Sequence, residues 1–167
     1  MKTTQIANRL RPVITQVQNN TSLWIGHLQT DTTDRFAGQT FICPASGALD
    51  NIQVYSATVQ TPGELVLTLH QFDAENKNWG PLLATCILNV NKSDEDKWIR
   101  FDLPAASLQK DQTYGFRLNA NAMIALGEAA VGNKDPFIGE EWHADSKNQE
   151  GNYYHYFSLT YKVEMLD

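Results

Sequence analysis

Residues 64–72 read ELVLTLHQF, and this stretch decides the fold class of the chain. Leu65, Leu67 and Leu69 occupy every second position, with smaller or more polar side chains between them. Successive side chains of a β-strand point to opposite faces, so a period of two places these three leucines on one face. The stretch therefore predicts a strand that packs one face into a hydrophobic core.

The same alternation continues on both sides of this stretch, from about residue 40 to the end of the chain. Turn-forming clusters such as TPG, DAENKNWGP and NKSDED separate the segments. Further candidate strands lie at residues 49–60, 82–90, 97–103, 114–120, 123–126, 136–144 and 154–163. Because no helical pattern lies between them, we predict an all-β fold in which two antiparallel sheets, with about eight strands in total, pack face to face.

An amphipathic segment precedes the strands. Its apolar residues recur at helical spacing and are Ile6, Leu10, Val13, Ile14 and Val17. We therefore predict a short N-terminal helical segment within residues 1–20, kinked at Pro12 because proline lacks the backbone N–H. The segment would either cover one end of the core or, through residues 5–18, contact a partner or a second copy of the chain. Covering the core is the simpler interpretation.

Length and charge narrow the class of protein. The 167 residues suffice for an ordinary hydrophobic core, so we expect residues 1–167 to form a single domain. Thirteen basic against 19 acidic residues give a net charge of −6, which argues against nucleic acid as a partner. No apolar run approaches the length of a membrane-spanning helix, so no membrane span is expected. The first residues contain no apolar signal-peptide region, so the chain as written is expected to be cytoplasmic.

The chain has two cysteines, Cys43 and Cys86, and each lies among apolar residues. Buried free thiols are the favoured interpretation, with a disulfide as the alternative, because the sequence cannot show whether the two residues approach bonding distance. Neither cysteine belongs to a Cys-x-x-Cys pair, so the cysteines give no support to a zinc site or to dithiol chemistry.

Five segments resemble a known family in the same order along the chain. They are residues 38–72 (GQTFICPASGALDNIQVYSATVQTPGELVLTLHQF), GPLLATCILNV, KWIRFDL, LQKDQTYGFRL and GNYYHYFSLTYKV. Together they resemble the jelly-roll β-sandwich modules, similar to carbohydrate-binding modules, of bacterial secreted and surface proteins. The resemblance covers about residues 36–164. It implies a jelly-roll sandwich, non-catalytic ligand binding and an extracellular or surface location.

Aromatic residues on polar strand faces are the best candidates for a binding site. Sugar rings pack their C–H groups on flat aromatic faces, while amides, carboxylates and guanidinium groups bind the hydroxyls. In the closing segment, Tyr154 and Tyr156 are predicted to lie side by side on the hydrophilic face. A large ring that covers the edge of the core is the alternative for each tryptophan. The candidate ligand-binding residues are Trp79, Trp142, Tyr154, Tyr156, Arg100, Asn119, Glu141 and His143.

A second pattern lies in GEEWHADS, where Glu141, His143 and Asp145 occupy alternate positions. On a strand these three groups share one face and could bind a metal, contact a ligand or face water. The polar run DSKNQEG follows directly, so a solvated face is the favoured interpretation. The other histidines form no His-x-His or His-Glu-x-x-His array, so we expect neither a metal site nor a cofactor.

Two functions from different classes remain open. The first is a non-catalytic ligand-binding module, most simply for carbohydrate. The second is a structural or assembly protein, such as a component of a phage-tail-like particle, that uses its N-terminal segment for contacts. We expect no enzymatic activity, because the sequence has no Gly-x-Ser-x-Gly motif, no phosphate-binding glycine loop and no cysteine paired with a base.

Overall fold

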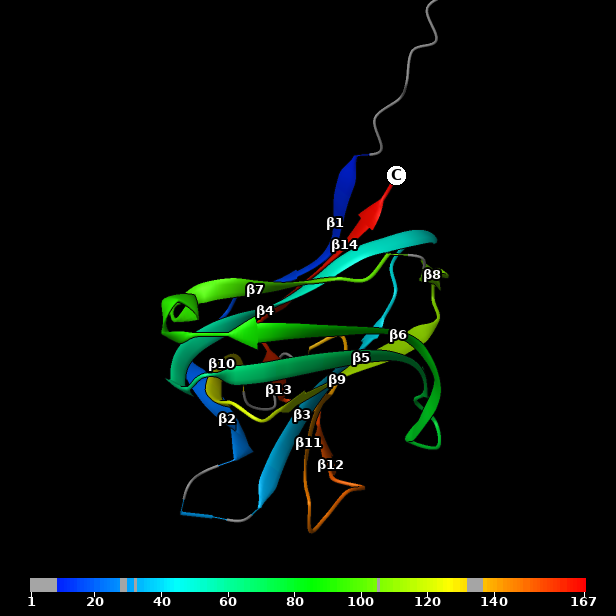
Figure 1. Ribbon diagram of the computed structural model, residues 1–167. Helices are drawn as coiled ribbons and strands as arrows, with labels where there is room; N and C mark the ends of the chain where they lie inside the picture. Colours follow the sequence, from blue (N-terminus) through cyan, green and yellow to red (C-terminus); the bar gives the residue numbers. More distant parts are fainter. Residues whose placement is uncertain (1–8, 28–29, 32, 105, 132–136) are drawn as a thin grey trace, which may run out of the picture.

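The computed structural model describes residues 9–27, 30–31, 33–104, 106–131 and 137–167, and these form an all-β structure (Figure 1). Every strand pair among them is antiparallel. The strands are β1 (Leu10–Gln16), β2 (Thr21–His27), β3 (Asp34–Ile42), β4 (Gly47–Thr61), β5 (Gly63–Asp73), β6 (Asn78–Val90), β7 (Lys97–Asp102), β8 (Ser107–Leu108), β9 (Thr113–Ala120), β10 (Met123–Ala130), β11 (Glu141–Asp145), β12 (Asn152–Tyr154), β13 (Phe157–Leu159) and β14 (Tyr161–Leu166). A single turn of 3-10 helix, Lys92–Asp94, precedes β7.

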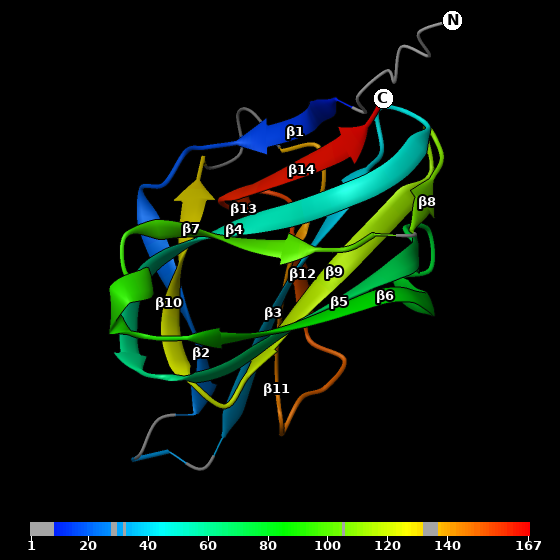
Figure 2. The ribbon, with the colours of Figure 1, turned by 45° about the horizontal axis from the view of Figure 1, so that its top comes forward.

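The strands form one hydrogen-bonded sheet, so the prediction of two separate sheets was wrong. Its main order is β1-β14-β4-β10-β2-β3-β9-β5-β6, and the remaining strands pair with β3, β4, β10 or β11. In Figures 1 and 2 the sheet curls, so that β4, β7 and β14 lie in a layer above β5, β6 and β9. The described part of the chain therefore encloses its core without the two independent sheets of a jelly-roll sandwich.

The long strand β4 explains the continuity of the sheet. Its first half pairs with β14, and its second half pairs with β10. The β4–β10 register shifts twice, between Met123 and Ile124 and between Ala125 and Leu126. Irregularities of this kind bend a strand and increase its twist, so one strand can pass from the upper to the lower layer without losing its partners.

The core lies between the layers, and the alternation in β5 is confirmed. Leu65, Leu67 and Leu69 are each 0% exposed, whereas the side chains between them are only partly buried. Phe41 and Phe116 lie in the same core and are also fully buried. Burial of each such side chain contributes about 1.5–3 kcal/mol, so the period-two pattern is the main source of stability for this fold.

The prediction of an N-terminal helix was wrong for the residues that the structure describes, since Leu10–Gln16 is the strand β1. It pairs with β14, and the register shifts between Pro12 and Ile14. An edge strand with an irregularity tolerates a proline, because no sheet hydrogen bond is required at that position. The β-branched residues that follow Pro12 favour an extended backbone. Ile14 is buried, Val17 is 57% exposed, and Ile6 lies outside the described residues.

The closing segment is not one strand, as predicted, but the three short strands β12, β13 and β14. They pair with β11, with β10, and with β4 and β1, respectively. Because the segment crosses between layers, period two does not hold along it. On a single strand, Ser158 and Thr160 would share the outward face of Tyr154 and Tyr156, yet each is 1% exposed. His155 would face inward on such a strand, and it is exposed.

Both cysteines are free, as the sequence predicted. Cys43 is buried and Cys86 is half-buried, and burial raises the pKa of each thiol above its ordinary value. Thiols of this kind are poor nucleophiles at neutral pH. Within the described ranges, no helix is long and apolar enough to cross a membrane.

Candidate functional site

The ribbon of β11 and β12 separates two side-chain clusters. In its antiparallel register Trp142 lies opposite Tyr153, and Glu141 lies opposite Tyr154. Residues opposite each other across a pair share a face, and neighbours along a strand alternate, so these two pairs lie on opposite faces. This confirms the prediction that Trp142 faces away from Glu141 and His143. Each face of the ribbon carries a different kind of chemistry.

The first face carries a stack of aromatic rings and a guanidinium group, here called the tryptophan–arginine cluster (Trp79, Arg117 and Trp142). The two indole rings meet edge to face with their centroids 5.3 Å apart. The Arg117 guanidinium carbon lies 4.2 Å from the Trp79 ring centroid and 4.8 Å from that of Trp142. Tyr153 and Phe72 extend the aromatic surface, with 5.7 Å between their centroids. A cation on a ring face is held by the quadrupole of the ring, and more strongly where water is excluded.

Two glycines make room for this cluster. A Cβ atom on Gly115 would lie 2.6 Å from Cζ3 of Trp79. A Cβ atom on Gly38 would lie 3.0 Å from Cε3 of Trp142 and 2.7 Å from the backbone oxygen of Phe116. Gly38 lies on β3 and Gly115 on β9, which are neighbours in the sheet. Because neither has a side chain, both indole rings lie close against the backbone of the sheet.

The cluster is polar at its edges, and not all of its buried polar atoms have hydrogen-bond partners among the described residues. Burial lowers the pKa of Arg117, yet the side chain remains a cation at physiological pH. Its Nε atom is buried without a hydrogen-bond partner among the described residues. Trp142 is 3% exposed and donates from Nε1 to the backbone oxygen of Glu150 at 2.9 Å, whereas Trp79 is only half-buried. Trp79 and Arg117 are therefore the members that a ligand can reach.

Hollows lie on both sides of the cluster. One, of about 600 Å³, is lined by Trp79, Arg117, Tyr153 and the amide side chains of Asn76, Asn78 and Gln149, among others. The other, of about 390 Å³, is lined by Thr68, Arg117, Asn119, Trp142 and Gln149 with three apolar neighbours. Arg117 and Gln149 border both hollows. The combination of flat rings, amides and a cation can hold a polar ligand that has one apolar face.

The opposite face of the ribbon carries the carboxylate–histidine cluster (Glu128, Glu141 and His143). His143 Nε2 lies 2.5 Å from Oε2 of Glu141 and 3.5 Å from Oε2 of Glu128. Glu141 is 0% exposed and Glu128 is 5% exposed. The interpretation of Glu141 as part of a solvated strand face was therefore wrong, because the β10 and β13 strands cover that face of β11.

The ionisation of this cluster is strongly coupled. Burial raises the pKa of Glu141 to about 8, since the protein interior disfavours the charged form. Burial disfavours the charged form of His143 and by itself would lower the pKa of this residue. The contacts of His143 with Glu128 and Glu141 outweigh burial and raise the pKa to about 9. For Glu128, the interaction with His143 outweighs burial and lowers the pKa. At neutral pH the cluster therefore holds one imidazolium, one carboxylate and one protonated carboxyl group.

Aromatic rings surround the imidazole of His143. The Tyr154 ring centroid lies 4.7 Å from that of His143, and the Phe157 centroid lies 6.3 Å from it. Tyr154 and Tyr156 are 5.9 Å apart and lie side by side, as the sequence predicted. Both tyrosines are half-buried. Their rings lie on the far face of the ribbon from the tryptophan–arginine cluster.

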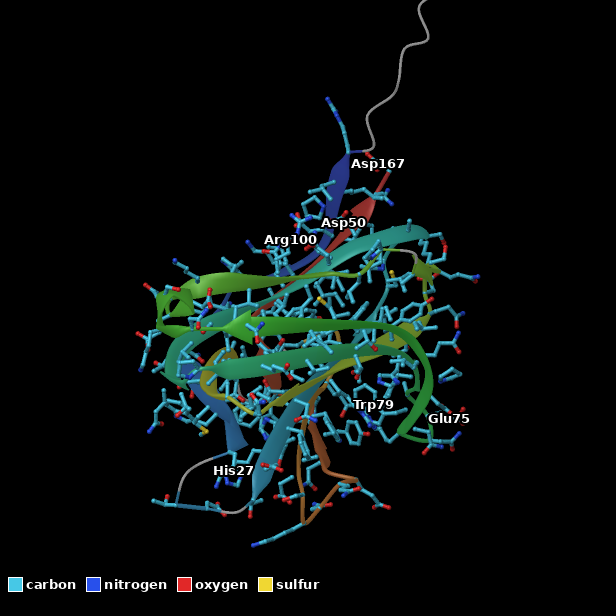
Figure 3. All side chains as sticks on the ribbon, in the orientation of Figure 1. His27, Asp50, Glu75, Trp79, Arg100 and Asp167 are labelled. Carbon is cyan, nitrogen blue, oxygen red and sulfur yellow. The ribbon has the colours of Figure 1, made fainter. Side chains whose placement is uncertain are left out.

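The predicted site residues thus lie in three separate parts of the structure. Trp79, Trp142 and Asn119 lie at the tryptophan–arginine cluster, and Glu141, His143, Tyr154 and Tyr156 lie at the carboxylate–histidine cluster. Arg100 belongs to neither, since it lies on β7 in the upper layer, where it pairs with Asp50 at 2.8 Å and with Asp102 at 2.9 Å (Figure 3). Asp145, considered with Glu141 and His143, instead accepts backbone N–H groups of Lys147 and Asn148 in the following turn.

Sequence reasoning did not identify Arg117 or Glu128 as site residues. Glu128 has a signal in the sequence, because it is the one charged residue of the apolar strand MIALGEAA, which is buried from Met123 to Ala129. A carboxylate within a buried strand requires a partner. Arg117 has a weaker signal, since the alternation of YGFRLNA places it on the polar face but cannot show that two distant tryptophans lie on either side of it.

No family model and no curated protein matches this chain. Two solved structures of a clostridial cysteine protease, Cwp84, resemble it in fold. The first, of the protease after propeptide cleavage, has a TM-score of 0.59 at 9% identity over 99% of this chain and 41% of that chain. The second contains the cysteine protease and lectin-like domains of this surface layer associated protein of Clostridium difficile, with a TM-score of 0.52 at 10% identity over 87% of this chain and 36% of that one. The chain thus spans about two fifths of these proteins, and the likeness shows a shared β-rich fold.

Proposed function

We propose that this chain is a non-catalytic carbohydrate-binding module of a surface or extracellular protein, and that the tryptophan–arginine cluster is its binding surface. The observation that carries the proposal is the accessible Trp79 ring beside Arg117, between two hollows lined by amide side chains. One structural neighbour, Cwp84, contains a lectin-like domain, and this supports the same class of function.

The chemistry of the cluster favours sugars that carry a carboxylate. The guanidinium of Arg117 has an unpartnered buried Nε, and no carboxylate within ion-pair distance of it is found among the described residues. A sugar carboxylate would pair with this guanidinium from the hollow that Arg117 borders, with an apolar face of the sugar ring against Trp79 and its hydroxyls toward Asn76, Asn78 and Gln149. Uronic acids and other acidic sugars combine these features.

Binding of the full chain to an array of acidic and neutral glycans, followed by calorimetry, tests this proposal. We expect acidic glycans to bind best, and Trp79→Ala to weaken binding about tenfold, since ring contacts of this kind contribute about 0.5–1.5 kcal/mol. Trp98→Ala is the matched control, because Trp98 is also half-buried beside a cation, Lys162 at 4.0 Å, but lies on β7. Equal loss of binding in both variants, or no glycan bound by the folded chain, would contradict the proposal.

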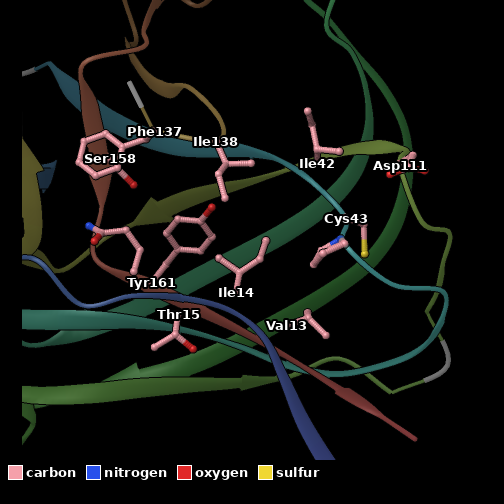
Figure 4. A pocket seen from close by; sticks show the side chains of 12 residues that line it. Val13, Ile14, Thr15, Ile42, Cys43, Asp111, Phe137, Ile138, Ser158 and Tyr161 are labelled. Carbon is pink, nitrogen blue, oxygen red and sulfur yellow. The ribbon is translucent and has the colours of Figure 1, made fainter. Parts of the chain in front are cut away.

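The second candidate, an assembly protein, is favoured by the surface around β1. Among the described residues, β1 pairs along one edge only, with β14, so its other edge can add a strand. A pocket of about 450 Å³ lies beside it, lined by Ile14, Phe137, Ile138 and nine further residues (Figure 4). Ile138 is 70% exposed and Ile42 is 45% exposed.

Light scattering of the full chain separates this candidate from the first. An assembly protein would give an oligomer, and Ile138→Asp, which places a charge on an exposed side chain, would shift it to monomer. Ile87→Asp is the matched control, because Ile87 is 59% exposed on β6, the strand at the opposite end of the sheet. A monomer at all concentrations would rule out self-assembly through β1.

A further inference from the structure

We propose that Glu128, Glu141 and His143 form a binding site for a divalent transition-metal ion, with zinc as the best match. The site lies on the opposite face of the β11–β12 ribbon from the proposed sugar surface, and the inference does not depend on that function. Its starting point is a pair of carboxylate oxygens, Oε2 of Glu128 and Oε1 of Glu141, that are buried without a hydrogen-bond partner among the described residues. Buried polar atoms almost always have a partner, and an ion is one of the few explanations when no protein group provides it.

The positions of the donor atoms suit a small cation. One ligand atom from each of the three residues lies within 4.8 Å of the other two. Zinc binds imidazole nitrogen and carboxylate oxygen at about 2.0–2.2 Å, so ligand atoms in a tetrahedral site lie about 3.3 Å apart. The separations from His143 Nε2, 2.5 Å to Glu141 and 3.5 Å to Glu128, lie on either side of that value. The two carboxylates lie within 4.8 Å of each other, so side-chain adjustments alone, without movement of the strands, would place all three ligands around one ion.

The charge of the cluster also matches a doubly charged cation. A divalent ion would displace the two protons that the cluster holds at neutral pH, and the two ionised carboxylates and neutral imidazole that remain carry two negative charges, which the ion neutralises. Imidazole nitrogen is a ligand of zinc and its neighbours in the first transition series, and zinc also accepts carboxylate oxygens. Calcium takes six to eight oxygen ligands, and this cluster provides far fewer. The donor set therefore favours zinc over calcium.

The surroundings hold the ligands in place and leave a route for the ion. Gln39 lies opposite Glu141 in the β3–β11 register, is fully buried and bonds to the backbone of Thr40 and Leu159, so Glu141 has a fixed neighbour, although Gln39 makes no hydrogen bond to the ligands themselves. His143 borders a hollow of about 410 Å³ between β2, β3 and β11, so an ion can reach its ring from solvent. Three protein ligands leave a fourth position for water or for an oxygen of a bound molecule.

Calorimetry with zinc chloride on the chelator-treated full chain tests the inference. We expect one zinc ion per chain and a rise in the unfolding temperature, because an ion that binds only the folded state stabilises it. Glu141→Gln and His143→Gln should each weaken zinc binding at least tenfold. Cobalt bound in place of zinc should give the visible absorption of a tetrahedral site in the unmodified chain and not in the variants.

The matched control is His27→Gln, since His27 is an exposed histidine that pairs with Asp34 at 2.8 Å, away from the cluster. Circular dichroism shows whether each variant is folded, and Glu128→Gln provides a second near-isosteric ligand variant if one fails to fold. Equal zinc binding by the unmodified chain and by the folded ligand variants would overturn the proposal. So would the absence of zinc binding at micromolar concentrations, which would leave a proton-sharing network as the function of the cluster. Preference for calcium over zinc would also contradict it.

Discussion

Trp142→Ala is expected to lower the free energy of unfolding by about 3–5 kcal/mol, the range typical of an aromatic side chain removed from a protein core. The indole ring is 3% exposed and fills the space above Gly38, in contact with Trp79 and Arg117. The substitution would leave a cavity there, because the backbone of β3 cannot move to fill it. It would also leave the backbone oxygen of Glu150 without the donor that it has at 2.9 Å.

Urea unfolding followed by far-ultraviolet circular dichroism measures this effect. Trp142→Phe keeps most of the ring and should lose less than half as much stability. Tyr156→Ala, which removes a half-buried ring outside the core, should lose clearly less. A loss below about 1 kcal/mol for Trp142→Ala would show that the ring does not pack as described. The result also matters for binding studies. Trp142→Ala would weaken the binding of any ligand because it destabilises the folded protein, so Trp79 is the more informative position for testing binding.

The metal-free protein is expected to lose several kcal/mol of stability as the pH rises from about 5 to 9, less than the sum of the two shifts below because Glu141 and His143 titrate as a coupled pair. The pKa of Glu141 is raised from 4.5 to about 8 by burial, and that of His143 is raised from 6.5 to about 9 by its two carboxylate neighbours, which outweigh burial. In both cases the folded state holds a proton that the unfolded state releases. The contribution of Glu141 is thus fully present below pH 4.5 and is lost by about pH 8, and that of His143 is present below pH 6.5 and is lost by about pH 9.

Glu128 acts in the opposite direction, because its pKa is lowered in the folded state. Its contribution is present above its ordinary pKa of 4.5 and is lost as the pH falls below that value. The stability of the chelator-treated protein should therefore be highest near pH 5. Chemical unfolding at a series of pH values measures the curve. Glu141→Gln, which cannot ionise, should flatten the decline between pH 5 and 8, and an unchanged slope in that variant would show that other groups cause it.

The sequence predicted burial correctly where a strand keeps one face in the core along its length. Leu65, Leu67 and Leu69 entered the core as the alternation required, because burial of apolar side chains is the largest favourable term available to a strand. The side-by-side tyrosines Tyr154 and Tyr156 were also found as predicted. From His155 to Thr160 the alternation failed, since this segment crosses from one layer to the other. It holds again in β14, where Tyr161 and Val163 are buried as predicted.

The N-terminal prediction failed for a related reason. A stripe of Leu10, Val13, Ile14 and Val17 fits a helix, but two of these residues are exposed and Ile14 alone is buried. Helical periodicity is meaningful only if the whole stripe is covered by another element. Here the unpaired edge of β14 was available, and pairing with it satisfies the backbone hydrogen bonds of a chain in which Pro12 interrupts a helix.

By itself, the sequence determined that this protein is all-β and that Trp142 and Glu141 face opposite ways, because both follow from local alternation. The free state of the two thiols was the favoured interpretation, but only the structure decided it. Only the tertiary structure decided which distant residues meet. Arg117 between Trp79 and Trp142, and Glu128 beside Glu141 and His143, come together through the register of β3, β9, β10 and β11. That register depends on the packing of the entire curled sheet, and no single stretch of the chain contains it.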